Sequence, residues 1–517
     1  MSASQPRARR RGGPRSRGGC GKCRARHIKC DETKPHCRRC LEMGKTCDGY
    51  STADPNNRAA PALTASPIAT YAIPFRIPGS QQDRRLLHYY CVQGADDLSG
   101  HLTSEFWTRL VLQHSHDHIA VRQAVVALSC VHQYHITAHH SSSLLPAEAM
   151  VQYSRAMRSL RKYMNAGINN NEAISAVVPL ICSVIFFCFE NTQGNTSAAI
   201  RHLDSGIAIL ARQKEAARLI PDSCDYEHLD LLEQIVAQFD LHASMFDDTR
   251  PLYTQLGPAV GFEITDITFK TIDDAHAELT RLQRRLLQFL ISNNHLQLCP
   301  ENDLPEELKL EKAAIEEAYT NWNEKLDRFR HDQSTPPKEC SDYSSSSDNI
   351  ETSPGEAGYS AQVPIITTLR IYSDVFQLLL AANFPYAPST FAGPSDSVNT
   401  HKLHTVLDLI ESTPQFQEAG SKRSLAVGSG IIAPLFLIVM KCTDPIVFKR
   451  AFDLLSALSG RREGMFDGRV LAEIALRIMR HCQTPRGSAA LESHPANDLD
   501  GTLIGLDGIA KNLGIIL

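Results

Sequence analysis

The chain has 517 residues, of which 43% are hydrophobic and 21% are charged, as expected for a globular protein with more than one domain. Its net charge of −4 is unevenly distributed: residues 1–50 hold 14 Lys and Arg against 4 Asp and Glu, and the other residues hold 39 against 53. This asymmetry predicts an anionic partner for the basic head and argues against one for the acidic body.

The first 19 residues read "MSASQPRARRRGGPRSRGG". They contain no apolar segment of the kind that a secretory signal needs, so we expect a reducing compartment. We predict a basic disordered tail over 1–19. Its "RARRR" run is compatible with a nuclear import signal, with an arm that contacts phosphates, and with a plain solvated tail.

Six cysteines follow in a repeated pattern, in which CxxC, six residues and another cysteine occur twice. A disulfide framework would need an oxidising compartment, so a metal site is the better interpretation. A structural zinc ion takes four thiolates, and six thiolates satisfy two ions only if two of them bridge. The spacing therefore predicts a binuclear zinc cluster over 20–50, with two zinc ions and the ligands Cys20, Cys23, Cys30, Cys37, Cys40 and Cys47.

A basic run, "RARHIK", lies between the second and third cysteines. We expect one short helix here, with Arg24, Arg26, His27 and Lys29 forming a cationic surface suited to phosphates and guanine edges. The alternative is a zinc module that binds RNA or protein, attached to a body that binds a ligand or carries an enzymatic activity.

The whole segment resembles the DNA-binding domain of the fungal zinc cluster transcription factors, with "IKCDETKPHC" and "CLEMGKTC" as matching loops. The resemblance implies that Cys20 and Cys37 bridge the metals and that Lys34 and Pro35 form the turn between the two halves. It also implies a CGG-like triplet in double-stranded DNA, with Arg26 and His27 near the bases and Arg24 and Lys29 on phosphates. His27 departs from the usual Lys or Arg, and a neutral imidazole offers guanine only one donor.

Five prolines punctuate residues 51–82, which we interpret as an extended linker without a coiled coil. Residues 83–517 have helical patterning and are predicted to form an all-helical domain. The apolar runs 173–189 and 425–440 are too short for membrane spans and predict buried core helices. Oligomeric state stays undecided between monomer and homodimer.

One interruption separates two helical regions of the body. Residues 331–362 are rich in serine and acidic residues and predict a disordered insertion. Just before it, an apolar stripe with helical spacing favours a helical hairpin over an intermolecular zipper; its members are Leu308, Ile315, Tyr319, Trp322, Leu326 and Phe329.

The body resembles the fungal-specific transcription factor regulatory domain in "LLHYYCVQGADDLSG", "SEFWTRLVLQ" and "APLFLIVMKCTDP". This implies a mainly α-helical, nuclear transcription regulator for RNA polymerase II genes, acting on a metabolic gene cluster, with a coactivator or small-molecule effector as a further partner class and no membrane partner.

Enzyme motifs offer little support for a catalytic body. "GSGIIA" at 428–433 fits only the loose dinucleotide pattern, and no nucleophile elbow surrounds Ser429. The histidines near residue 114 lack the carboxylate-supported spacing of a metal site; they are His114, His116, His118, His132, His135, His139 and His140. We therefore expect no enzymatic activity.

Overall fold

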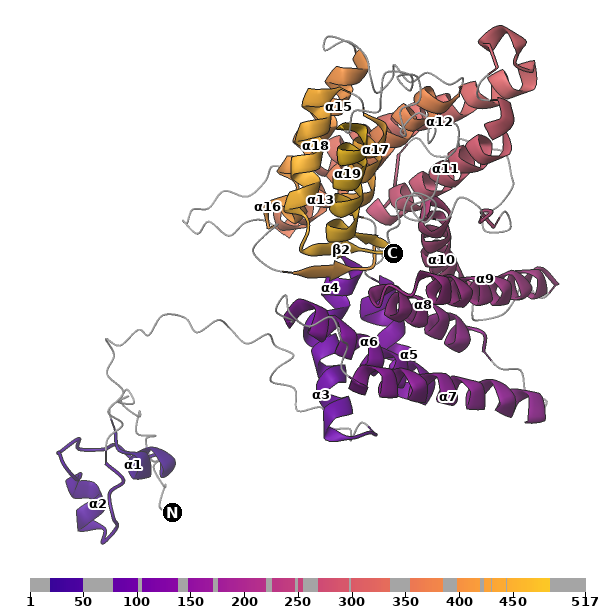
Figure 1. Cartoon of the computed structure of the whole chain (residues 1–517). Helices are drawn as coiled ribbons and strands as arrows, with labels where there is room; N and C mark the ends of the chain where they lie inside the picture. Colours follow the sequence, from indigo (N-terminus) through magenta and orange to yellow (C-terminus); the bar gives the residue numbers. More distant parts are fainter. Residues whose placement is uncertain are drawn as a thin grey trace, which may run out of the picture. The chain divides into compact units, whose positions relative to one another are not determined.

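The structure is a computed structural model. The residues it describes are 19–49, 78–100, 105–137, 147–170, 175–219, 226–246, 250–253, 268–296, 299–334, 354–384, 398–418, 423–428, 430–442 and 444–483. The chain divides into two compact units, residues 1–76 and residues 77–517. Figure 1 shows both units. Residues 1–18 of the predicted tail and most of the predicted linker lie outside the described residues.

The first unit contains two short helices, α1 (Gly21–Ala25) and α2 (Arg38–Glu42). Its core consists of cysteines rather than hydrophobic side chains. A segment this small buries too little apolar surface to be stable alone, so a metal is the expected source of its folding free energy.

The second unit is built almost entirely of helices, which confirms the predicted mainly α-helical class. Its first half has the elements α3 (Gln81–Tyr89), η2 (Tyr90–Gly94), α4 (Ala95–Ser99), η3 (Phe106–Leu110), α5 (Val111–Asp117), α6 (Ile119–Thr137), α7 (Ala147–Asn170), α8 (Val177–Thr192), α9 (Thr196–Leu219) and α10 (Tyr226–Phe246). The second half has α11 (Ile272–Ser292), η4 (Asn294–Leu296), η5 (Glu301–Asp303), α12 (Glu306–Ser334), α13 (Pro354–Asn383), α15 (Val398–Ser412), α16 (Pro414–Gln417), α17 (Ile432–Lys441), α18 (Pro445–Ala457) and α19 (Gly468–Gln483).

Local sequence signals fix several helix starts. Helix α3 begins with a capping box, in which Ser80 accepts from the Asp83 backbone N–H while Asp83 accepts from that of Ser80. Thr271 and Asp274 form the same box at α11. Each box satisfies two backbone donors that a helix N-terminus leaves unpaired. The helical body thus begins slightly before the predicted boundary at residue 83.

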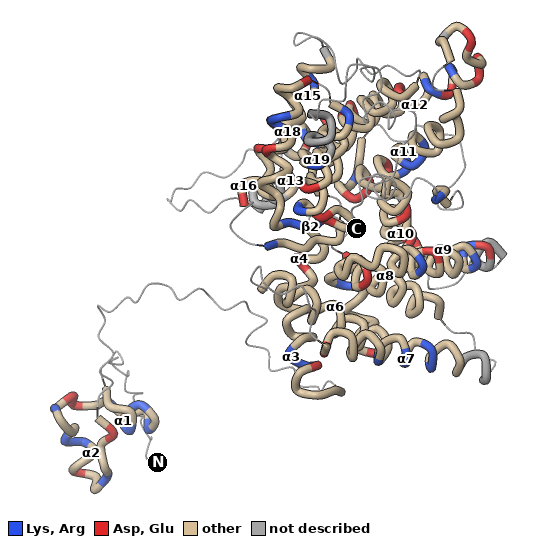
Figure 2. The backbone as a smooth tube through the Cα atoms, in the orientation of Figure 1, with Lys and Arg blue, Asp and Glu red and all other residues tan. Residues whose placement is uncertain are grey.

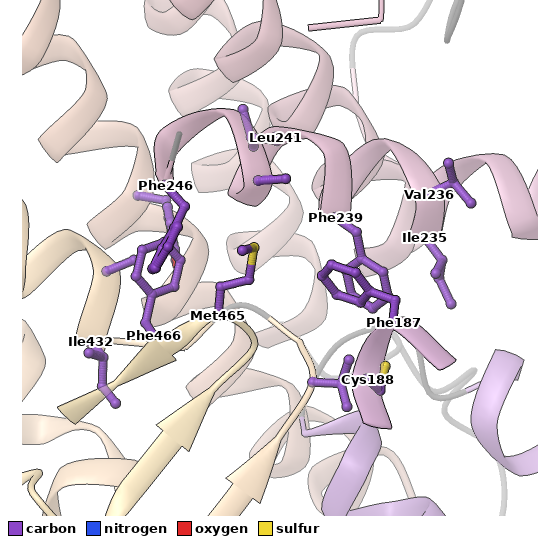
Figure 3. Packing of buried hydrophobic residues seen from close by; sticks show 14 of the residues in the cluster. Phe187, Cys188, Ile235, Val236, Phe239, Leu241, Phe246, Ile432, Met465 and Phe466 are labelled. Atoms are coloured by element: carbon purple, nitrogen blue, oxygen red, sulfur yellow. The ribbon is translucent and has the colours of Figure 1, made fainter. Parts of the chain in front are cut away.

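Helix α8 lies in the core of the second unit, as its apolar sequence predicts. All its residues from Val177 to Asn191 are buried. The Phe187 ring stacks on Phe239 of α10 with centroids 4.6 Å apart. Figure 3 shows this pair near Met465 and Phe466, which come from the C-terminal part of the chain. Residues nearly 300 positions apart therefore share one core.

The stripe on α12 packs within the chain. Ile315, Tyr319 and Trp322 are fully buried, and α12 packs against both α11 and α13. The Trp322 indole N–H donates to the carbonyl oxygen of Ala275 in α11 at 3.0 Å. The hairpin interpretation is confirmed, because these side chains are not available to a second chain.

A small sheet interrupts the second apolar run. Strand β1 (Ser424–Ala426) pairs in parallel with β2 (Arg461–Glu463), which pairs antiparallel with β3 (Phe466–Asp467). The prediction of one helix over 425–440 is therefore wrong in its first part. The run changes structure because the glycines before Ile432 break it into a strand and a helix.

Both ends of the predicted disordered insertion over 331–362 are helical. Residues 331–334 continue α12 and residues 354–362 belong to α13, whereas 335–353 lie outside the described residues. Pro354 is tolerated because backbone N–H groups in the first turn of a helix have no acceptor within the helix, so the N–H that proline lacks costs no hydrogen bond. Within α13, Gln362–Asn383 is long and apolar enough for a membrane span, but 67% of an apolar 18-residue window in it is buried in the body, as in a core helix.

Candidate metal centre and nucleic-acid interface

Each CxxC pair opens a short helix in the first unit. Cys20 is the N-cap of α1 and Cys23 lies one turn into it, and Cys37 and Cys40 hold the same positions in α2. One helical turn brings two side chains to the same face, so both sulfurs of a pair point the same way. The repeated sequence thus gives a repeated local structure.

The six sulfurs gather into two overlapping sets of four. One set is Cys20, Cys23, Cys30 and Cys37, and the other is Cys20, Cys37, Cys40 and Cys47. In each set the sulfurs lie within 4.8 Å of one another. Cys20 and Cys37 belong to both sets, and their sulfurs are 3.6 Å apart.

The sulfur geometry fits zinc. Zinc–sulfur bonds of about 2.3 Å in a tetrahedron place neighbouring sulfurs roughly 3.8 Å apart. The Cys23 and Cys37 sulfurs are 3.7 Å apart, and those of Cys20 and Cys40 are 3.9 Å apart. Four soft thiolates at this spacing would suit a closed structural site, in which zinc binding supplies folding free energy.

The cysteines differ in how readily they ionise. Burial raises the pKa of the Cys23 thiol, because a thiolate loses its hydration there. By contrast, backbone N–H groups of Cys37 and Gly49 lower the pKa of Cys47 to about 7. Metal binding must therefore displace protons from the buried thiols, and zinc affinity will fall in acid.

Asp31 joins the two halves of the unit. Its carboxylate accepts from the Thr33 hydroxyl and from the backbone N–H groups of Arg38, at 3.0 Å, and Arg39, at 3.4 Å. These contacts lower the pKa of Asp31 to about 2, so the carboxylate stays ionised. Asp31 was not among the residues predicted from the sequence; its signal was an acidic side chain just after the third cysteine. The turn between the halves lies at Lys34 and Pro35, which are joined by a cis peptide bond.

The predicted short helix over 24–29 has different bounds. Helix α1 ends at Ala25, and the chain turns at His27, whose φ is +54°. This left-handed backbone turns the chain back towards Cys30, which must reach the cluster. Arg24, His27 and Lys29 are all exposed, so they remain accessible although they do not share one helix.

Arg26 lies against the cluster. Its guanidinium donates to the Cys40 sulfur at 3.5 Å, to the Met43 sulfur at 3.3 Å and to the Lys22 carbonyl oxygen at 3.3 Å. Two roles are thus open to this side chain, one towards DNA and one towards the sulfur of Cys40.

Two alternative sites in the second unit find no support in the described residues. Among the described residues, the only groups of His, Cys, Asp or Glu close enough together to hold a metal are the two cysteine sets of the first unit. His139 and His140 lie outside the described residues. At the glycine motif, the N-terminus of α17 already has an anion, because the buried Glu463 carboxylate accepts from the Ile432 N–H at 2.8 Å. A phosphate would have to displace it.

Two family descriptions match the chain. The fungal Zn(2)-Cys(6) binuclear cluster domain matches residues 18–57, and the fungal specific transcription factor domain matches residues 85–463. The protein is therefore a fungal transcription regulator of the zinc cluster type, with a zinc-binding, DNA-binding head. The chain belongs to the family defined by the fungal specific transcription factor domain, which covers most of its length.

Relatives of known role agree with this assignment. An aspercryptin biosynthesis cluster-specific transcription regulator from Emericella nidulans is 25% identical over 92% of this chain and 88% of its own length. Transcription regulator lscL from Purpureocillium lilacinum is 25% identical over 61% of this chain and 80% of its own. A pestheic acid cluster transcriptional regulator from Pestalotiopsis fici is 56% identical over 7% of this chain and 6% of its own length. No solved structure matches the chain.

Proposed function

We propose that this protein is a nuclear, sequence-specific regulator of RNA polymerase II transcription that binds two zinc ions per chain. Cys23 and Cys30 would be terminal ligands of one ion, Cys40 and Cys47 of the other, and Cys20 and Cys37 would bridge them. The observation that carries this proposal is the pair of four-sulfur sets that share two cysteines.

DNA recognition is assigned to the basic residues beside the first CxxC pair. Arg24 and Lys29 would contact phosphates, while Arg26 and His27 would read a CGG-like triplet in the major groove. The exposure of all four side chains and the +10 charge of residues 1–50 support this role. Reading by Arg26 requires its guanidinium to leave Cys40.

The target is proposed to be a metabolic or biosynthetic gene cluster. The Emericella relative is named for such a cluster and aligns with nearly the whole chain. In this organisation a basic disordered tail over 1–19 precedes a DNA-binding head over 20–50, a linker spans 51–82, and the body over 83–517 controls activity through a coactivator or a small molecule. The family consists of transcription regulators, and no catalytic role is proposed.

Selection from a random double-stranded DNA library tests the proposal. The zinc-loaded full chain should enrich a CGG-like triplet, and a chelator or Cys37→Ser should abolish the enrichment. One triplet would indicate a monomer, and two at fixed spacing would indicate a dimer. Failure to enrich any sequence with zinc bound would contradict DNA readout.

Arg26→Ala separates the two roles of Arg26. If the side chain reads bases, the selected triplet degenerates while zinc affinity is unchanged. If it supports the Cys40 thiolate instead, zinc affinity falls and the triplet is retained by protein that still holds zinc. Arg38→Ala, an exposed arginine on α2, is the matched control.

A further inference from the structure

Helix α7 packs into the second unit by one side only. Ala149, Tyr153 and Ala156 are buried, and the Tyr153 ring stacks on Phe189 of α8 with centroids 4.3 Å apart. Figure 1 shows α7 along one edge of this unit. Beside this packed side, Met150, Met157 and Met164 are 45%, 38% and 41% exposed. These three residues form the methionine row.

The methionine row has the spacing of a helix–helix seam. Its members are seven residues apart, which keeps them on one face of the helix and spans roughly 21 Å. Val151, beside the first of them, is 49% exposed. Methionine is common at surfaces that accept helical partners, because its flexible thioether adapts to different side chains. A partner helix of about four turns would match this length.

Cations accompany the row. Arg155, Arg158, Arg161 and Lys162 all lie on α7 and are exposed, and none has a carboxylate partner among the described residues. Figure 2 shows how Lys and Arg recur along this helix, in contrast to the acidic balance of the chain after residue 50. Arg161 is four residues after Met157 and three before Met164, so it is a neighbour of both on the helix surface.

We infer that the outer face of α7 binds an acidic amphipathic helix from a partner protein. The apolar side of that helix covers the methionine row, and its Asp and Glu residues pair with the flanking cations of α7. A second copy of α7 is disfavoured because it would bring these like charges together. DNA is disfavoured because its phosphates would pair the cations but leave the methionines uncovered.

Two designed peptides test this inference. Both are fluorescent helices of about 20 residues with leucine at the heptad seam, one flanked by Glu and the other by Lys. Binding to the zinc-loaded full chain is measured by anisotropy at low and high salt. The Glu peptide should bind at least about tenfold more tightly, with a preference that weakens in high salt.

Paired variants identify the surface. The double variant Met157→Gln with Met164→Gln should bind the Glu peptide about tenfold more weakly. The double variant Arg158→Glu with Arg161→Glu should bind the Lys peptide more tightly than the Glu peptide. The control is Leu310→Gln with Arg328→Glu on α12, where Leu310 is 69% exposed. All these side chains are exposed, so thermal melting by circular dichroism should be unchanged.

Several outcomes would overturn the inference. Equal binding of the two peptides, or an equal loss in the α12 control, would remove the assignment to α7. Light scattering that shows a dimer dissociated by the methionine substitutions would make a second copy the occupant. If duplex DNA displaced the peptide from the unmodified chain but not from the Arg158→Glu, Arg161→Glu variant, the surface would be a nucleic-acid contact.

Discussion

The two shared cysteines should matter more than the terminal ones. Cys20 and Cys37 belong to both four-sulfur sets, whereas Cys23 and Cys47 belong to one each. If Cys20 and Cys37 bridge two ions as proposed, replacing a shared cysteine with serine removes a ligand from both ions, and replacing a terminal cysteine removes one ligand from one ion. Structural zinc binds with about 10–16 kcal/mol, so each of four bonds contributes roughly 3 kcal/mol. Serine at a shared position should therefore cost about twice as much zinc-binding free energy as serine at a terminal position.

Zinc stoichiometry and affinity measure this difference. The full-length variants are titrated against a chromophoric chelator, and bound zinc is counted per chain. Cys20→Ser and Cys37→Ser should retain little zinc, while Cys23→Ser and Cys47→Ser should each hold the ion of the intact set. Cys299→Ser, in the second unit, is the control and should leave zinc unchanged. Equal losses at shared and terminal positions would refute the bridging arrangement.

Three other predictions concern DNA contact and the body. Arg24→Ala should weaken binding to all sequences alike and reduce the salt slope by about one unit; an unchanged slope in a filter-binding series would exclude a phosphate contact. Burial, with His276 adding to it, lowers the pKa of His242 to about 4. The imidazole of the unfolded chain has a pKa near 6.5, so below that pH the unfolded state takes up a proton that the folded state does not. The free energy of unfolding should therefore be constant above pH 6.5 and fall below it, by roughly 1.4 kcal/mol at pH 5.5. Urea unfolding should show this loss, reduced in His242→Gln. Asp240 is fully buried and pairs with two arginines, at 2.7 Å and 2.5 Å; Asp240→Ala should cost about 3–5 kcal/mol in the same assay, and a loss near zero would contradict a buried pair.

Local patterns in the sequence were sufficient for the two CxxC turns of the head. The cysteine spacing specified the two CxxC turns, since one helical turn suffices to bring two sulfurs together. It did not reveal the end of α1 at Ala25, the backbone reversal at His27 or the position of Arg26 over Cys40. These features depend on how the two halves close around a common centre. Which residues bind metal and DNA remains a prediction.

In the body, the sequence by itself determined the helical class, the buried apolar run of α8 and the buried stripe of α12. A helix that is apolar all round is buried in a core, and an apolar stripe with helical spacing faces one. Only the tertiary structure decided where a stripe meets its partner. Phe187 stacks on Phe239, and the Asn191 side chain donates to the carbonyl oxygen of Gly464 at 2.7 Å. Such contacts join segments that no local pattern relates, and the short strands exist because Ser424–Ala426 finds its hydrogen-bonding partner far along the chain. The exposure of one face of α7 could not be predicted from the sequence either, because the burial of a helix face depends on which other elements pack against it.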